Sequence, residues 1–285
     1  MHDRAVALGI VALLVSSALA LTAQTEPPSA KAQWTLAWSD EFTDPQLDNS
    51  KWVYDIGGGK WGNQELEYYT DLPQNVSIQD GKLAITARQE KHTATNKTIW
   101  NFTSGRIKTL GKFTQTYGRF EARIKVPFGQ GIWPAFWMLG EDIAKVDWPN
   151  CGEIDIMENI GKEPAIVHGT IHGPGYSGAG GIGNLYALPQ GQRFADEFHV
   201  FAVEWEPHAI RFYVDDNLYA TRTPAELPPG KKWVYDHPFF LLINLAVGGD
   251  WPGNPDASTV FPQTMLVDYV RVYSRKEHWV SKVQT

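Results

Sequence analysis

Short segments in which apolar and polar residues alternate recur along most of this chain of 285 residues. Residues 117–127, YGRFEARIKVP, are an example, because every second residue from 120 to 126 is apolar. The apolar positions are Phe120, Ala122, Ile124 and Val126. Turn residues such as Asp80-Gly81 separate the segments, and helical periodicity is almost absent. This pattern predicts an all-β fold, an antiparallel β-sandwich or jelly roll.

The first two dozen residues differ from the rest of the chain. A short charged start precedes the apolar run 5–20, which ends in small residues. Ala18-Leu19-Ala20 has the form of a signal-peptidase site, and Leu21-Thr22-Ala23 is a second candidate. The run is shorter than the ~20 residues that a membrane span needs. We therefore predict a signal peptide over residues 1–23 and a secreted protein, extracellular or periplasmic, with no membrane association after processing.

The remainder of the chain has the organisation of one domain. Residues 24–33 form a proline-containing, flexible lead-in, residues 34–275 the domain, and residues 276–285 a tail. The net charge of −7 and the lack of a basic run argue against nucleic acid as a partner. The single cysteine, Cys151, excludes an internal disulfide, and we interpret it as a small buried side chain. We expect a monomer.

Residues 152–159, GEIDIMEN, hold three acidic residues within six positions. Side chains alternate across a strand, so Glu153 and Asp155 share one face. Strict alternation would place Glu158 in the core, where an ionised carboxylate without a partner is very costly. Either the strand ends early, or a β-bulge inserts one residue and returns Glu158 to the acidic face. Bulges are common next to active sites.

Three carboxyl groups on one face suit the hydrolysis of a glycosidic bond. That reaction needs an acid for the leaving oxygen and a second carboxylate at the anomeric carbon, ~5–5.5 Å apart in retaining enzymes. Asp155 between Glu153 and Glu158 would hydrogen-bond one carboxylate and raise the pKa of the other acid. The alternative is a solvated acidic strand or a calcium site. The apolar residues between the acids favour a half-buried, catalytic strand.

Residues 131–139, GIWPAFWML, lie shortly before the acids. Alternation places Trp133 and Trp137 on one face, on either side of the small Ala135, with Phe136 and Met138 on the other. Twelve tryptophans occur in the chain, and most of them would fill the core of a sandwich. Indole rings also stack on the flat apolar faces of sugars. Because Trp133 and Trp137 are near the acidic strand, we predict that they bind a sugar chain.

Two further motifs do not support other functions. Residues 178–183, GAGGIG, match a dinucleotide-binding pattern, but no helix or βαβ unit surrounds them. They are interpreted as a glycine-rich loop at the edge of a cleft. His168 and His172 share a face of one strand, but no third ligand stands at a zinc-site spacing. We expect His172 to point into a polar cleft.

With these residues in place, the chain resembles glycoside hydrolase family 16, in particular its bacterial laminarinase branch. The resemblance runs from about Trp38 to Tyr273, over ten segments in the same order. Among them are WSDEF (38–42), WGNQELEYYT (61–70), SGRIKT (104–109), GEIDIMEN (152–159) and LLINLAVGG (241–249). It implies a β-jelly roll with a concave substrate cleft and a retaining endo-hydrolase of β-1,3-glucan. Cys151 departs from the family pattern without affecting this chemistry.

The resemblance also implies roles for individual residues. Glu153 resembles the nucleophile, Asp155 its helper and Glu158 the general acid/base, with the bulged spacing of laminarinases. Trp133 and Trp137 resemble sugar-stacking residues. The polar cleft contacts that it implies are Asn63, Arg106, His172 and Asn244. The structural calcium ion that it implies would be bound by Glu41, Gly81 and Asp268, partly through backbone oxygens, while catalysis itself needs no cofactor.

Other functions stay open on this fold. A mixed-linkage β-1,3-1,4-glucanase or a transglycosylase would differ in loop shape and in how well the acceptor side excludes water. A non-catalytic glucan-binding module would keep the tryptophans but usually lose one or both glutamates. Because all three acids are present, the sequence favours an enzyme whose partner is a β-glucan polysaccharide.

Overall fold

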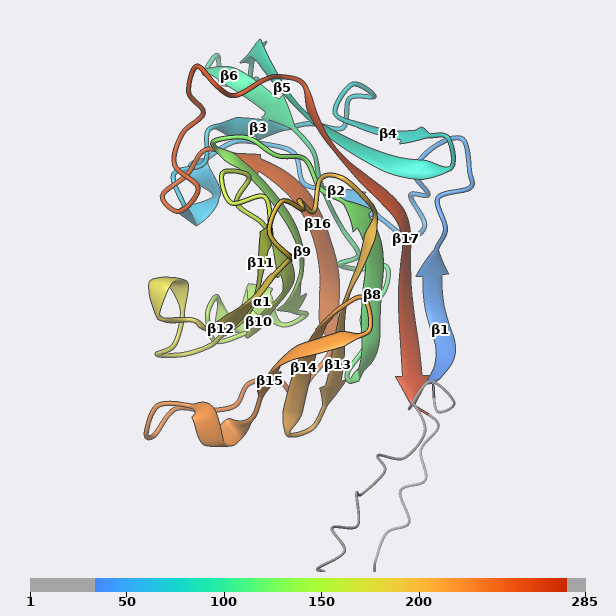
Figure 1. Cartoon of the computed structure of the whole chain (residues 1–285), viewed down its shortest axis with the longest axis vertical. Coiled ribbons are helices and arrows are strands. Elements are labelled where there is room, and N and C mark those ends of the chain that lie inside the picture. The colour runs from blue at the N-terminus through green and yellow to red at the C-terminus, as the bar shows by residue number, and fades with distance from the viewer. Residues whose placement is uncertain (1–33, 276–285) are drawn as a thin grey trace, which may run out of the picture. The chain divides into compact units, whose positions relative to one another are not determined.

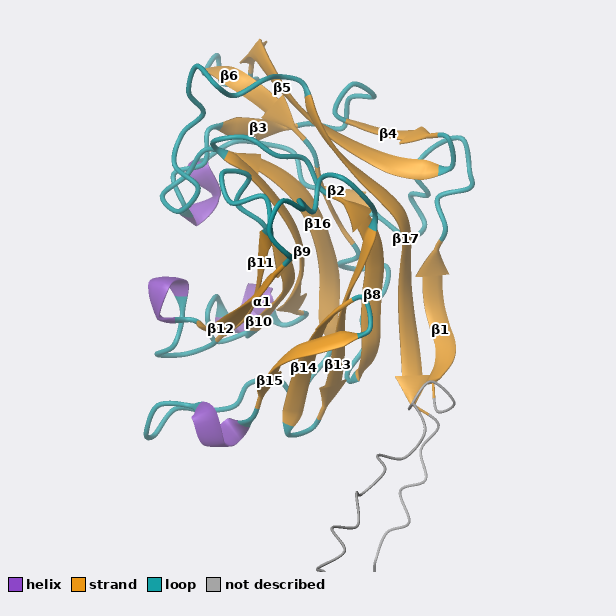
Figure 2. Ribbon diagram, in the orientation of Figure 1, coloured by secondary structure: helices purple, strands orange, loops and turns teal. Residues whose placement is uncertain are grey.

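The computed structural model describes residues 34–275. Figures 1 and 2 show that these residues form two β-sheets, with helix confined to short turns. The predicted signal peptide, lead-in and tail lie outside the described residues. Among the described residues, no helix is long and apolar enough to cross a membrane.

The larger sheet, sheet A, has ten strands. Its neighbours run in the order β15-β14-β13-β8-β17-β5-β6-β3, with β1 paired to β17 and β4 to β5. The strands of sheet A are β1 (Trp34–Asp40), β3 (Glu67–Tyr69), β4 (Val76–Gln79), β5 (Lys82–Thr93), β6 (Ile99–Ser104), β8 (Gly118–Lys125), β13 (His199–Glu206), β14 (Ala209–Val214), β15 (Asn217–Arg222) and β17 (Gln263–Arg275). All pairs are antiparallel except β3 with β6, which is parallel.

The smaller sheet, sheet B, has seven strands in the order β12-β11-β10-β9-β16-β7-β2. They are β2 (Val53–Tyr54), β7 (Arg106–Lys108), β9 (Ile132–Gly140), β10 (Glu153–Glu158), β11 (Ile166–His172), β12 (Ile182–Ala187) and β16 (Phe239–Val247). The helical turns are η2 (Lys60–Gly62), α1 (Ile143–Val146), η3 (Gly178–Gly180) and η4 (Pro224–Glu226). The predicted all-β fold, an antiparallel β-sandwich or jelly roll, is confirmed by these two sheets.

The core lies between the two sheets and is filled by the inward-facing side chains of their strands. In β8, Phe120, Ala122 and Ile124 are buried as the alternation predicts. In β9 and β10 the core face carries Phe136 and Ile154 in the same way. The other face of sheet B is therefore left for polar and aromatic side chains, and β10 lies between β9 and β11 on that face.

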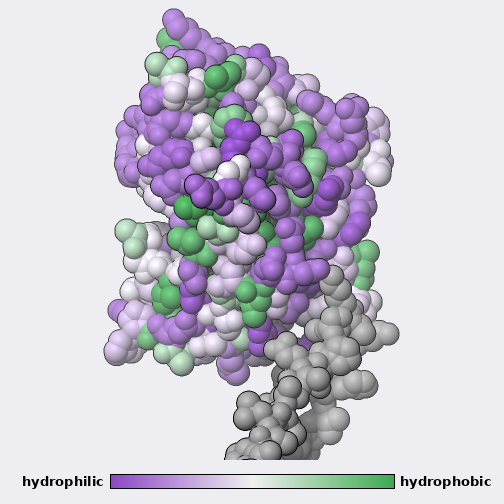
Figure 3. All heavy atoms as spheres, viewed as in Figure 1, coloured by the Kyte–Doolittle hydropathy of each residue, from purple (hydrophilic) through white to green (hydrophobic). Residues whose placement is uncertain are grey.

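Figure 3 shows the molecule as spheres in the same view, hollowed at its left margin. The hollow lies between the turn η2 and the turn η3, which Figure 2 draws as purple coils at that margin. These two turns come from the loop before β3 and from the glycine-rich segment before β12.

Candidate active site

The strand β10 contains the expected bulge. Both of its ladders shift register after Asp155: this residue lies opposite Trp137 of β9, and Glu158 lies opposite Ala135. Two residues of β10 separate Asp155 from Glu158, whereas only one residue of β9 separates their partners. This extra residue turns Glu158 back to the face of Glu153 and Asp155. The structure thus confirms the bulge rather than an early strand end.

Glu153 and Asp155 form a cluster with His172 of β11. The imidazole Nε2 lies 3.0 Å from Asp155 Oδ2 and 3.8 Å from Glu153 Oε1. The other carboxylate oxygen of Glu153 accepts a hydrogen bond of 2.7 Å from the indole Nε1 of Trp148. Within residues 34–275, Glu153, Asp155 and His172 are the one group of three acidic, histidine or cysteine side chains close enough together to share a metal ion.

Glu158 is hydrogen-bonded to the aromatic wall. The indole Nε1 of Trp133 donates to Glu158 Oε1 at 3.1 Å. Burial, and then the charge of Asp155, raise the pKa of Glu158 well above its usual range. A raised pKa favours the protonated form, which is the form that a general acid needs.

The two other carboxyl groups also resist ionisation. Burial, and then the charge of Asp155, raise the pKa of Glu153 to about 8, while burial raises the pKa of Asp155 to about 7. His172 and the hydrogen bond from Trp148 act in the opposite direction on Glu153, because they favour its ionised form. Glu153 therefore has the partners that a carboxylate nucleophile needs.

The glycine-rich segment explains how His172 is held. A Cβ atom on Gly181 would collide with the His172 imidazole, so only glycine allows the loop to cover the ring so closely. On the backbone side, the Tyr235 hydroxyl donates to the His172 carbonyl at 2.8 Å. The loop at residues 178–183 thus packs over a residue of the acidic cluster, and the structure gives no role to it in dinucleotide binding.

Trp137 is the centre of a second group of contacts. Its indole Nε1 donates to Asn244 Oδ1 of β16 at 2.7 Å. The Arg106 guanidinium lies 4.9 Å from the ring centre of Trp137 and 4.7 Å from that of Trp61, and it pairs with Asp55 at 2.9 Å. Arg106 and Asn244 therefore both contact Trp137 rather than the acids.

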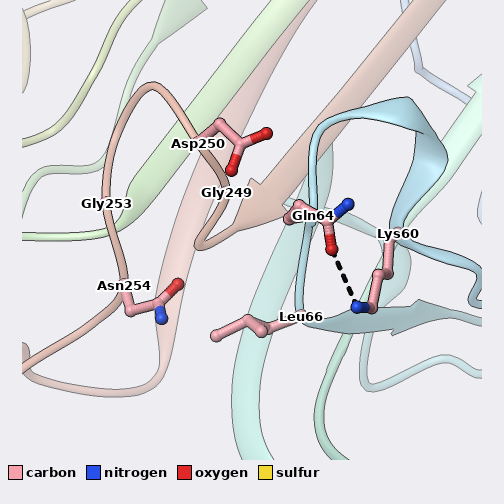
Figure 4. A pocket seen from close by; sticks show the side chains of 7 residues that line it. All are labelled: Lys60, Gln64, Leu66, Gly249, Asp250, Gly253 and Asn254. Carbon is pink, nitrogen blue, oxygen red and sulfur yellow. Dashed lines mark hydrogen bonds between the residues drawn. The ribbon is translucent and has the colours of Figure 1, made fainter.

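The loop before β3 meets the loop after β16 beside these aromatic residues. The Asn63 carbonyl accepts the Asp250 N–H at 2.8 Å, and the Asn63 side chain donates to Glu65 at 3.2 Å. A pocket lies between the two loops, lined by Lys60, Gln64, Leu66, Gly249, Asp250, Gly253 and Asn254. Figure 4 shows Lys60 hydrogen-bonded to Gln64 on one side of it, with Asp250 and Asn254 on the other.

The loop after β16 also brings in a tryptophan that the sequence analysis does not single out. The Trp251 ring lies edge-on to Trp133, with their centres 5.6 Å apart, and against His168 at 4.9 Å. Trp148, likewise not singled out, comes from the irregular segment between β9 and β10. Both indoles are partly exposed, at 39% and 45%, so they add solvent-accessible aromatic surface to both ends of the acidic strand.

The predicted calcium ligands do not form such a cluster. Both oxygens of the Glu41 carboxylate accept hydrogen bonds from Arg271, at 2.9 and 2.8 Å. Asp268 pairs with Arg123 at 2.7 Å, and Gly81 lies in the turn that joins β4 to β5. Arginine side chains thus pair with both carboxylates. Calcium binding at these residues stays a prediction.

Cys151 agrees with its interpretation as a buried side chain. The thiol is free and fully buried, and burial raises its pKa to about 11. A thiol that stays protonated at neutral pH is a poor nucleophile. Cys151 therefore packs beside the catalytic strand without taking part in its chemistry.

The fold and this site define a class of protein, a β-jelly roll that carries paired carboxyl groups among exposed indoles on one sheet. The sequence model described as "Glycosyl hydrolases family 16" matches residues 63–271, and the chain belongs to this family. The protein is accordingly a glycoside hydrolase.

Several known proteins are similar to this chain in sequence, and solved structures are similar to it in fold. The "Beta-glucanase" of Rhodothermus marinus is 44% identical over 255 residues, which cover 84% of this chain and 85% of that protein. The endo-beta-1,3-glucanase of Pyrococcus furiosus is 50% identical, with a TM-score of 0.83 over 86% of this chain and 96% of that one. A non-specific endo-beta-1,3(4)-glucanase, co-crystallised with a glucan oligosaccharide, is 34% identical, with a TM-score of 0.80 over 88% and 98%.

Proposed function

We propose that this protein is a retaining endo-β-1,3-glucanase that cleaves laminarin-like glucans by double displacement. The observation that carries the proposal is the bulged strand β10, which holds Glu153, Asp155 and Glu158 on one face beside exposed indoles. The names of the similar proteins from Rhodothermus marinus and Pyrococcus furiosus support β-glucan as the substrate and the β-1,3 linkage as the bond cleaved.

In the first step, Glu158 donates its proton to the glycosidic oxygen while a carboxylate oxygen of Glu153 attacks the anomeric carbon. The bond between that carbon and the oxygen breaks, and a covalent glycosyl-enzyme forms. In the second step, Glu158 removes a proton from water, and the water oxygen attacks the same carbon and releases Glu153. Two inversions retain the β configuration, and carboxyl groups of the chain carry both steps without a cofactor.

The neighbouring residues have supporting roles in this proposal. His172 lies within 4 Å of both carboxyl groups, where it orients Glu153 and favours its ionised form, while the charge of Asp155 acts against ionisation of its neighbours. Trp133 hydrogen-bonds Glu158 and, with Trp137, offers ring faces to successive glucose units. Asn63, Arg106 and Asn244 complete the polar surroundings of the glucan.

A mixed-linkage β-1,3-1,4-glucanase is the second candidate. It is favoured by the likeness to the non-specific endo-beta-1,3(4)-glucanase, whose fold and chain length match closely. Both activities need the same acids, so they differ in the subsites that accept a β-1,4-linked glucose unit. A transglycosylase would transfer the glycosyl group of the glycosyl-enzyme to a sugar acceptor instead of water. A non-catalytic glucan-binding module would form no glycosyl-enzyme.

The deciding experiment measures the release of reducing ends from linear β-1,3-glucan, beside barley mixed-linkage glucan, cellulose and agarose. We expect fast release of short oligomers from the first substrate and none from a Glu153→Ala variant. Equal or faster release from the barley glucan would favour the second candidate. Retention on a glucan column without release from any substrate would mean a binding module.

The cellular setting is part of the same proposal. We propose export through the signal peptide predicted over residues 1–23, followed by action as a secreted monomer on an external polysaccharide. The Arg271 and Arg123 contacts of Glu41 and Asp268 do not favour the predicted calcium ion. No step of the proposed reaction depends on such an ion.

A further inference from the structure

A second pair of buried acids lies away from the catalytic strand. Glu65 lies just before β3, and Glu67 is the first residue of this strand. Their side chains are only 5% and 0% exposed, respectively. Within the described part of the chain, neither forms a salt bridge with a lysine, arginine or histidine. The charge of Arg106 favours the ionised form of Glu65, but the Arg106 guanidinium forms a salt bridge with Asp55 instead. Two carboxyl groups are thus buried without a cation in contact with them.

The two carboxyl groups hydrogen-bond each other, which requires a proton between them. Glu67 Oε2 accepts the Val247 N–H at 2.7 Å. Its Oε1 receives no hydrogen bond from an N–H or hydroxyl group of residues 34–275. Burial, and then the charge of Glu65, raise the pKa of Glu67 well above its usual range. The pair therefore carries one negative charge rather than two.

A chain of hydrogen bonds fixes which of the two acids is ionised. Trp137 Nε1 can only donate, so Asn244 Oδ1 is the acceptor at 2.7 Å. Asn244 Nδ2 must then donate to the Tyr69 hydroxyl oxygen at 3.1 Å. The Tyr69 proton is left to donate to Glu65 Oε2 at 3.3 Å. Glu65 therefore accepts and is ionised, and the shared proton lies on Glu67.

We propose that Glu65 and Glu67 are positioning residues for glucan binding: ionised Glu65 and protonated Glu67 orient the Trp137 indole through Tyr69 and Asn244. The inference rests on the proposed function, because it assigns to Trp137 a glucose unit of the β-1,3-glucan. Neither acid touches the substrate. Their effect reaches it through the relay formed by Tyr69, Asn244 and Trp137.

The same pair also fixes the polar edge of this surface. Glu65 Oε1 accepts a hydrogen bond of 3.2 Å from Asn63 Nδ2, which leaves the Asn63 side-chain oxygen free to accept from a sugar hydroxyl. Glu67 binds the backbone of Val247, directly before the loop that carries Trp251. One proton thus sets the donor and acceptor pattern on both sides of Trp137.

Replacing each acid by glutamine distinguishes the two roles. Glu67→Gln keeps the pattern, because the amide oxygen can accept from Val247 and the amide NH2 can donate to Glu65. Glu65→Gln breaks it, since the carboxylate accepts from Asn63, Tyr69 and Glu67 and an amide has only one acceptor atom. Its NH2 group would oppose the donor from Asn63 or from Tyr69.

The test compares these two variants of the full chain on linear β-1,3-glucan. We expect Glu65→Gln to raise KM about three- to tenfold, the loss of about one hydrogen bond, with kcat within about twofold of wild type. Glu67→Gln should keep KM within about twofold. The dissociation constant of the linear β-1,3-linked glucose hexamer, measured in a Glu158→Gln background, should change in the same way.

A purely structural role would give a different result. Glu65→Gln would then lower the melting temperature and the active fraction, and so the apparent kcat, without raising KM. An unchanged KM for Glu65→Gln would overturn the inference. So would equal KM values for the two variants, or a rise in KM that is confined to Glu67→Gln. If Glu65→Gln does not fold, Tyr69→Phe replaces it, because loss of the hydroxyl breaks the same relay and should raise KM in the same range.

The hexamer titration separates this inference from the proposed function. A wild-type chain that binds the hexamer without cleaving β-1,3-glucan would end the proposed hydrolase activity, and the dissociation constants of the variants would still decide the role of the pair. If the wild-type chain cleaves β-1,3-glucan but Glu65→Gln and Glu67→Gln have the same KM and the same dissociation constant for the hexamer, only the inference is overturned.

Discussion

The acidic side chains on the outer face of sheet A and those of strand β10 in sheet B behave in opposite ways. On the outer face of sheet A they have arginine partners: Glu41 with Arg271, Glu121 and Glu204 with Arg119, Glu206 with Arg211, and Asp268 with Arg123. On the face of sheet B, the described residues give Glu153, Asp155 and Glu158 no lysine or arginine partner. The hydrogen bond from Arg271 lowers the pKa of Glu41, whereas burial raises the pKa of all three β10 acids.

The difference separates charges that stabilise the fold from charges kept for chemistry. A paired surface carboxylate adds little free energy of unfolding, but it does not reduce it. A buried carboxylate without a cation reduces the stability of the folded state, and such groups persist where function needs them. The acids of β10 should therefore be essential for turnover and unfavourable for stability, and the arginine-paired acids on the outer face of sheet A the reverse.

The largest effect should come from Glu158→Gln. Loss of the proton donor should lower kcat on unactivated β-1,3-glucan about 10²–10⁴-fold, the range for general acid/base catalysis, with KM within about twofold. Steady-state kinetics with linear β-1,3-glucan measure both constants. Glu41→Gln is the matched control, since it removes an acid of sheet A and should leave kcat unchanged. Retention of most of the wild-type rate by Glu158→Gln would contradict the assignment.

Glu153→Gln should have a smaller effect: it should raise the stability of the folded state at high pH. The unfolded chain releases the Glu153 proton near the usual pKa of 4.5, whereas the folded chain holds it until about pH 8. The unfolded state binds fewer protons in this window, so the stability of the wild type falls as pH rises through it. Glutamine removes this loss, which is about 1.4 kcal/mol for each unit of pKa shift.

Thermal unfolding of the wild type and Glu153→Gln at two pH values measures this effect. The melting temperatures should be close at pH 4, and the variant should be higher at pH 8, by about 2–4 °C for each kcal/mol. A variant that melts at or below the wild-type temperature at pH 8 would show that Glu153 does not destabilise the fold.

The sequence predicts the local part of the site well. Alternation in residues 131–139 places Trp133 and Trp137 on one face, and the spacing of Asp155 and Glu158 calls for the bulge that the structure contains. Both conclusions depend only on neighbours within one strand. The buried residues of β8 are predicted for the same reason.

What the sequence does not reveal depends on contacts between distant segments. The relay from Glu65 through Tyr69 to Asn244 depends on a hydrogen bond between Tyr69 and Asn244, which are 175 positions apart, so no local pattern marks it. Trp148 reaches Glu153 from an irregular segment that has no periodicity. The calcium prediction rests on the family resemblance alone, and the arginine partners of its ligands are visible only once β17 is paired with β1 and β8.

The smallest effect should be that of Glu41→Gln on stability. The pKa of Glu41 is lowered from its usual 4.5, mainly by the hydrogen bond from Arg271, so its contribution to stability is present above pH 4.5. It is lost as pH falls through the lowered pKa. Since the pair is exposed, the variant should lose less than about 1 kcal/mol at pH 7. Urea unfolding at pH 7 and at pH 3 measures this loss, which should shrink at the lower pH. A gain in stability at pH 7 would mean that the acids of both sheets destabilise the fold, so arginine pairing would not separate structural from catalytic carboxylates.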